Sequence, residues 1–173
     1  GALGPAADAG RIGLLGHSRG GGMAVLYAAD DARIGSLVTW SAIATFQRWT
    51  EHQKERWRAQ GSLPLAKDST ISPLRLGSAL LDDLERNAER LDLERAAARV
   101  GCPWLIVHGH EDMTVPLKEA MQLHTAATNG RTELRVLEHV GHLYHAASRD
   151  EDGYRTIDGI IAASAHWYQS TLT

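Results

Sequence analysis

Three polar residues, each placed just after a predicted strand, could together carry out nucleophilic catalysis. Residues 11–15 form an apolar strand that leads into Gly-His-Ser-Arg-Gly at 16–20, and a helix rich in small residues follows. This is the G-x-S-x-G pattern in the strand-turn-helix context that a nucleophile elbow requires. The turn needs strained backbone angles, and the two glycines remove Cβ atoms that would collide there. Ser18 is therefore the candidate nucleophile.

A candidate acid and a candidate base follow later in the chain. Residues 102–108 are an unbroken apolar run typical of a buried parallel strand, and Asp112 lies in the polar turn behind it. Residues 132–138 alternate as a strand and lead to His142. Ser18, Asp112 and His142 thus all follow the carboxyl ends of predicted strands, where open α/β sheets place their sites.

Other residues compete for these roles. Glu111 adjoins Asp112 and is the alternative acid, and His145 is the alternative base. The nine histidines also raise the hypothesis of a zinc site, because imidazole and carboxylate groups crowd two of the predicted loops. No H-E-x-x-H or comparable ligand pattern is present, and a metal would occupy the residues that the triad needs. We therefore predict neither a metal nor a cofactor.

On these motifs the chain resembles the α/β-hydrolase superfamily, and within it the dienelactone-hydrolase-like and cinnamoyl or feruloyl esterase-like groups. The sharp matches are residues 16–20, 108–116 and the Gly-His pair at 141–142. The resemblance implies that Ser18 is the nucleophile, His142 the base and Asp112 the acid. It also implies that the backbone N–H of Arg19 is one oxyanion donor. The implied fold class is α/β: the C-terminal half of an α/β-hydrolase fold, with a parallel sheet flanked by helices.

Proteins of this family usually carry further strands before the elbow, and the loop after the third strand supplies the second oxyanion donor. Only residues 1–10 precede the elbow strand here. We therefore interpret 1–173 as a single, partial domain that lacks the N-terminal strands. Strand 11–15 would then be an exposed apolar edge, which predicts self-association.

The other elements fit the same plan. We predict a second buried strand at 34–43 and helices at 19–29, 116–127 and 154–172. An insertion at about 44–100 is predicted to form a helical cap, with helices at 44–60 and 78–91 and a linker at 61–73.

Four side chains are candidates for substrate contact. Phe46 and Trp49 of the insertion, with Trp40 just before it, either line an apolar pocket or attach the cap to the core. His17 lies beside the nucleophile, where a packing or hydrogen-bonding role is also usual.

The composition bounds the class of protein. The chain has 173 residues, 43% of them hydrophobic and 23% charged, and a net charge of -3. These values are typical of one globular domain. The charged residues form no basic stripe of the kind that binds nucleic acid. No apolar run approaches the ~20 residues of a membrane helix. The single cysteine, Cys102, is predicted to be a core residue. We expect a cytoplasmic protein with a small-molecule ester substrate.

The sequence therefore predicts a serine hydrolase that cleaves carboxylic esters through an acyl-enzyme. A peptidase of the prolyl-oligopeptidase type and an acyltransferase remain open as alternatives. A further alternative is a catalytically silent fragment or partner-binding remnant, because the second oxyanion donor is unassigned.

Overall fold

A computed structural model describes residues 8, 10–64, 74–146 and 151–172. It divides the chain into two compact units. The sheet unit consists of residues 1–45 and 93–173, and the insertion unit consists of residues 46–92.

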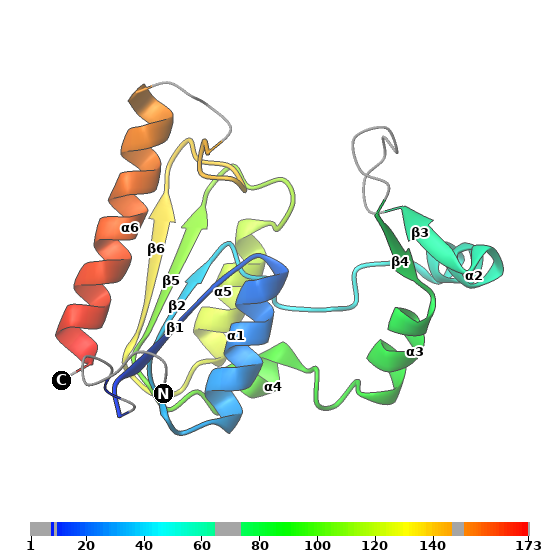
Figure 1. The fold of residues 1–173 in the computed structure, drawn as a ribbon, viewed down its shortest axis with the longest axis horizontal. Coiled ribbons are helices and arrows are strands. Elements are labelled where there is room, and N and C mark those ends of the chain that lie inside the picture. Colours follow the sequence, from blue (N-terminus) through cyan, green and yellow to red (C-terminus); the bar gives the residue numbers. More distant parts are fainter. Residues whose placement is uncertain (1–7, 9, 65–73, 147–150, 173) are drawn as a thin grey trace. The chain divides into compact units, whose positions relative to one another are not determined.

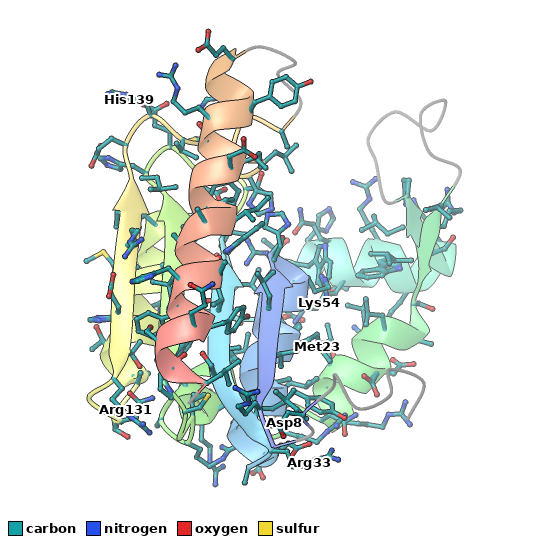
Figure 2. All side chains as sticks on the ribbon, turned by 60° about the vertical axis from the view of Figure 1, so that its left-hand side comes forward. Asp8, Met23, Arg33, Lys54, Arg131 and His139 are labelled. Carbon is teal, nitrogen blue, oxygen red and sulfur yellow. The ribbon has the colours of Figure 1, made fainter. Side chains whose placement is uncertain are left out.

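The sheet unit contains four parallel strands in the order β1-β2-β5-β6. They are β1 (Ile12–His17), β2 (Ile34–Trp40), β5 (Trp104–Gly109) and β6 (Thr132–Leu137). All four strands therefore end at the same edge of the sheet. Figure 2 shows this direction, because Arg33 and Arg131 lie where β2 and β6 begin, and His139 lies at the opposite end.

Helices cover both faces of the sheet. α1 (Arg19–Asp30), α4 (Leu93–Ala97) and α5 (Leu117–Ala126) lie on one face, and α6 (Glu151–Thr171) lies on the other (Figure 1). Because two layers of helix exclude water, the two central strands can be apolar on both faces. Leu37 and Val38 of β2 and Leu105, Ile106 and Val107 of β5 are accordingly fully buried.

The outer strands are less covered than the central ones. In the described part of the chain β1 and β6 form the two edges of the sheet, and Leu15 of β1 is 42% exposed. Self-association through β1 stays a prediction. No helix within the described ranges is both long and apolar enough to cross a membrane.

The predicted elements of the sheet unit agree with the structure to within a few residues, with one informative difference. The strand predicted at 34–43 ends at Trp40. Ser41 has a φ of 44°, which lies outside the β region, so the chain leaves the sheet there despite the apolar residues that follow.

The insertion unit has its own small framework. α2 (Glu51–Gln60) and α3 (Ala79–Arg86) flank a two-stranded antiparallel sheet of β3 (Ser62–Pro64) and β4 (Arg75–Gly77). The buried Trp57 of α2 donates its indole N–H to the carbonyl of Leu76 at 2.9 Å. Its ring also meets that of Trp49 edge to face, with centroids 4.9 Å apart.

Several details of the predicted insertion are wrong. The first helix begins at Glu51 rather than at 44, because Thr50 and Gln53 form a capping box that starts it there. The second helix ends at Arg86, where Asn87 adopts a non-helical conformation. Within the predicted linker, residues 62–64 are strand β3, and residues 65–73 lie outside the described residues. The compact insertion ends at residue 92, because α4 packs against α1 and α5 in the sheet unit.

The two glycines of the G-x-S-x-G motif have different structural roles. A Cβ atom built on Gly16 would lie 2.4 Å from the carbonyl oxygen of Gly20 and 2.8 Å from the Cα of Gly21. These are backbone atoms and cannot rotate away. A Cβ atom on Gly20 meets nothing within 4 Å. The close approach of β1 to α1 thus requires glycine only at the first position.

We therefore expect Gly16→Ala to lower the free energy of unfolding by about 3 kcal/mol, because the overlap forces strand and helix apart. Gly20→Ala serves as the matched control and should change it by between about 0 and +1 kcal/mol, since alanine favours a helix. Urea unfolding followed by circular dichroism measures both. Equal destabilisation by the two substitutions would contradict this steric assignment.

Candidate active site

Ser18 sits on a strained turn between β1 and α1. Its φ of 56° and ψ of -124° lie in a region that residues other than glycine rarely adopt. Backbone bonds hold it there. The Ser18 N–H donates to the carbonyl of Trp40 at 2.9 Å, and its carbonyl accepts N–H groups of Gly21 and Gly22 at 3.0 and 3.2 Å. The strain is therefore supported from both the sheet and the helix.

The structure brings the three predicted site residues into one hydrogen-bonded line. Nε2 of His142 lies 3.0 Å from Oγ of Ser18, and Nδ1 of His142 lies 2.8 Å from Oδ2 of Asp112. The side chain of Asp112 is fully buried and that of His142 is 14% exposed. A carboxylate can only accept, so Nδ1 carries the hydrogen and Nε2 is left to accept the hydroxyl proton of Ser18.

The other oxygen of Asp112 is held by the turn that follows it. Oδ1 accepts the backbone N–H groups of Thr114 and Val115 at 2.9 and 2.8 Å. Burial alone would raise the pKa of Asp112. The hydrogen bonds from Val115, His142, Ser41 and Thr114 outweigh burial, and the pKa lies below its ordinary value. The carboxylate is therefore ionised at neutral pH.

Two buried hydroxyl groups lie behind this carboxylate, and sequence reasoning missed both. Oγ of Ser41 is 2.9 Å from the hydroxyl of Tyr144, which donates to the carbonyl of Val107 at 3.1 Å. Ser41 is fully buried and Tyr144 is 2% exposed, and both have positive φ angles, of 44° and 53°. The available signal was their position, because Ser41 follows a strand end directly and Tyr144 follows His142 by two residues.

A second buried imidazole supports the acid turn. His108, the fifth residue of β5, donates its Nε2–H to the carbonyl of Val115 at 2.8 Å, and this nitrogen is 3.6 Å from Oδ2 of Asp112. Burial is the largest influence on His108 and lowers its pKa, so the ring is neutral. It therefore supports the turn that binds Asp112 without adding charge.

The two alternative site residues are engaged elsewhere. Glu111 faces Nδ1 of His139 at 3.1 Å on the surface, and the Nε2–H of His145 donates to the carbonyl of His139 at 3.0 Å. A second imidazole–carboxylate contact of this kind joins Nδ1 of His110 to Oε2 of Glu138 at 2.6 Å. The two imidazole–carboxylate contacts, Glu111 with His139 and His110 with Glu138, tie the loop after β5 to the loop after β6. Among the described residues no group of three His, Cys, Asp or Glu side chains could hold a metal ion.

The four candidates for substrate contact have different surroundings. His17 is half-buried, and its Nε2–H donates to the carbonyl of His142 at 3.0 Å. Trp40 donates to Oγ of Ser164 at 3.1 Å, and its ring lies 6.0 Å from that of Tyr144. Phe46 and Trp49 belong to the insertion unit, where Phe46 is 4% exposed. That these four residues bind substrate stays a prediction.

Arg19 is the first residue of α1 and follows Ser18 directly. The N–H groups in the first turn of a helix have no acceptor within the helix and lie at its positive end. That the backbone N–H of Arg19 is an oxyanion donor stays a prediction.

The bonds to Asp112 predict a pH-dependent contribution to stability. Its folded pKa is lowered, so the stabilisation is fully present above the unfolded value of about 3.9 and is lost as pH falls through the folded value. We expect Asp112→Asn to lower the free energy of unfolding by about 1–3 kcal/mol at pH 6 and by progressively less below about pH 4. Urea unfolding between pH 2 and pH 6 measures this difference.

Asp158→Asn, at an exposed position on α6, is the matched control and should show no such trend. A cost for Asp112→Asn that stayed constant down to pH 2 would show that the carboxylate charge contributes nothing.

Comparisons with known proteins agree with this architecture. The sequence profile of the Alpha/beta hydrolase family matches residues 2–154. No curated protein matches the chain in sequence.

Several solved structures share the fold. The monoacylglycerol lipase of Paleococcus ferrophilus has 17% identity and a TM-score of 0.64, and the match covers 90% of this chain and 69% of that one. The esterase domain of a Rhodothermus marinus protein has 21% identity and a TM-score of 0.57, and the match covers 90% of this chain and 61% of that one. The acylaminoacyl peptidase of Pyrococcus horikoshii has 20% identity and a TM-score of 0.61, and the match covers 99% of this chain and 26% of that one. The chain thus spans from about a quarter to about two thirds of the length of these proteins, and it belongs to the Alpha/beta hydrolase family.

Proposed function

We propose that this protein is a serine hydrolase that cleaves carboxylic esters through a covalent acyl-enzyme. The observation that carries the proposal is the line of hydrogen bonds from Ser18 through His142 to Asp112. A strained serine, an imidazole and a buried carboxylate in this order are the parts that acyl transfer needs.

In this proposal each atom of the hydrogen-bonded line has a role. Oγ of Ser18 attacks the acyl carbon while Nε2 of His142 takes the hydroxyl proton, and the same nitrogen returns this proton to the departing alcohol. Water then attacks the acyl-enzyme, gives one proton to His142 and releases the acid, and Ser18 recovers its proton. Asp112 keeps Nδ1 protonated and stabilises the imidazolium that forms in each half of the reaction.

The negative oxygen of the tetrahedral intermediate needs donors as well. In this proposal the backbone N–H of Arg19, at the positive end of α1, is one of them. Removing one such donor typically costs ~10²–10³ in rate, so the complement of donors sets how active the chain is.

A peptidase is the second candidate. The solved peptidase of Pyrococcus horikoshii matches over 99% of this chain, although at 20% identity this likeness concerns the fold alone. Comparing hydrolysis of aryl esters with that of blocked aminoacyl amides separates the two activities. An acyltransferase would instead transfer the acyl group to an added alcohol in preference to water.

The first test is labelling of the purified chain with a fluorophosphonate, followed by intact mass and peptide mapping. We expect one label per chain, on Ser18, and none in Ser18→Ala. His142→Ala should slow labelling by about 10³-fold or more, because the hydroxyl loses its base.

Ser164→Ala is the matched control, because Ser164 is a serine outside the hydrogen-bonded line that bonds to the carbonyl of Ile160 and to Trp40. It should label at the wild-type rate. A folded wild-type chain that takes up no label would contradict the proposed function and favour the silent or partner-binding alternative.

A further inference from the structure

We infer that His17 is a positioning residue of this site: its ring N–H on the backbone carbonyl of His142 holds the catalytic imidazole in line between Ser18 and Asp112. The inference rests on the proposed function. It differs from a substrate contact, because the partner of His17 is the protein's own backbone.

The contact joins two segments that are far apart in the sequence. His17 is the last residue of β1, and its Nε2 lies 3.0 Å from the carbonyl oxygen of His142, 125 residues away. A carbonyl oxygen only accepts, so Nε2 of His17 must carry the hydrogen. The bond reaches the main chain of the catalytic histidine itself, so it acts on the position of that residue directly.

The rings of the two histidines are also in contact. Their centroids are 4.8 Å apart and the planes are tilted by 38°. The ring of Tyr144 meets that of His17 edge to face at 6.1 Å. His142 is therefore held at its Nδ1 by Asp112, at its backbone by the His17 N–H, and along its ring by the His17 imidazole.

The loop that carries His142 needs such support, because it has little regular structure. The segment at 138–146 contains no helix or strand, and His139, Tyr144 and His145 have φ angles of 58°, 53° and 57°. A segment without a regular ladder of backbone bonds depends strongly on contacts to other elements to keep its shape. The bond from His17 is one of these contacts, and it comes from the carboxyl end of strand β1.

The position of His17 in the chain makes this bond effective. His17 directly precedes Ser18, so the path from the nucleophile to the backbone of the base is one peptide link and one hydrogen bond. A shift of the elbow would therefore shift the base with it. This matters because a displacement of about 1 Å between reacting groups can cost ~10²-fold in rate.

The test separates the donor from the ring. His17→Phe keeps an aromatic ring but removes the N–H, whereas His17→Gln removes the ring but places an amide N–H at a similar reach. We expect the second-order rate of fluorophosphonate labelling at Ser18 to fall by about 10–100-fold in His17→Phe. It should stay within about threefold of wild type in His17→Gln.

A second readout does not depend on activity. The proton between Nδ1 of His142 and Asp112 is buried, so proton NMR should resolve it downfield in the wild type and in His17→Gln. It should be lost or exchange-broadened in His17→Phe. His166→Leu, at an exposed position on α6, is the control for loss of a histidine and should change neither readout.

The outcomes separate this inference from the proposed function. If the wild type takes no label, the proposed function fails, and the NMR signal alone then decides whether His17 positions His142. If His17→Phe labels at the wild-type rate and keeps the downfield proton, the inference is wrong. Should His17→Phe fail to fold, His17→Leu replaces it in both measurements with the same expectations.

Discussion

The close passage of β1 over the first turn of α1 is the constraint on which the site depends. Gly16 approaches the backbone of Gly20 and Gly21 so closely that no side chain fits between them. The sharp turn between β1 and α1 places Ser18 at a φ of 56°. Its hydroxyl is directed at His142, and its backbone is bonded to β2 and α1. An alternative turn without this strain would not deliver the hydroxyl to the same point.

The parallel sheet then supplies the partners. Because β1, β5 and β6 all end at one edge, the three loops that follow them meet there. Asp112 is the most firmly held of the three residues. Asp112 is buried, receives two backbone N–H groups from its own turn, and lies beside the neutral His108 and the hydroxyl of Ser41. Hydrogen bonds to both oxygens of this buried carboxylate define its geometry more strictly than apolar packing does.

Sequence reasoning could predict the parts of this arrangement that are encoded locally. The apolar strands point to Ser18, Asp112 and His142, because each of these residues follows the end of a strand. The strands of a parallel sheet all end at the same edge, so residues that follow them come together there. The side chains that support these three residues are different in kind. Ser41, Tyr144 and His108 are recognisable as site residues only once non-local packing is known, since serine, tyrosine and histidine occur in many other roles.

The errors in the insertion have simpler causes. The Thr50–Gln53 capping box was a readable start signal and outweighs the aromatic periodicity that suggested an earlier helix. The strands β3 and β4 have only three residues each, which is too short for an alternating pattern to stand out. The short helix α4 was assigned to the insertion because its sequence cannot reveal that it packs on α1 and α5.

All three residues of the hydrogen-bonded line belong to one compact unit, and the chain leaves that unit after residue 45 and re-enters it at 93. The three residues of this line and the intervening 46–92 segment are thus encoded by separable stretches of sequence. Substitutions, insertions or exchanges in that segment need not disturb the elbow, the acid turn or the histidine loop. Such a layout lets the two stretches vary independently of one another, which offers one physical reason why a single scaffold can diversify so widely.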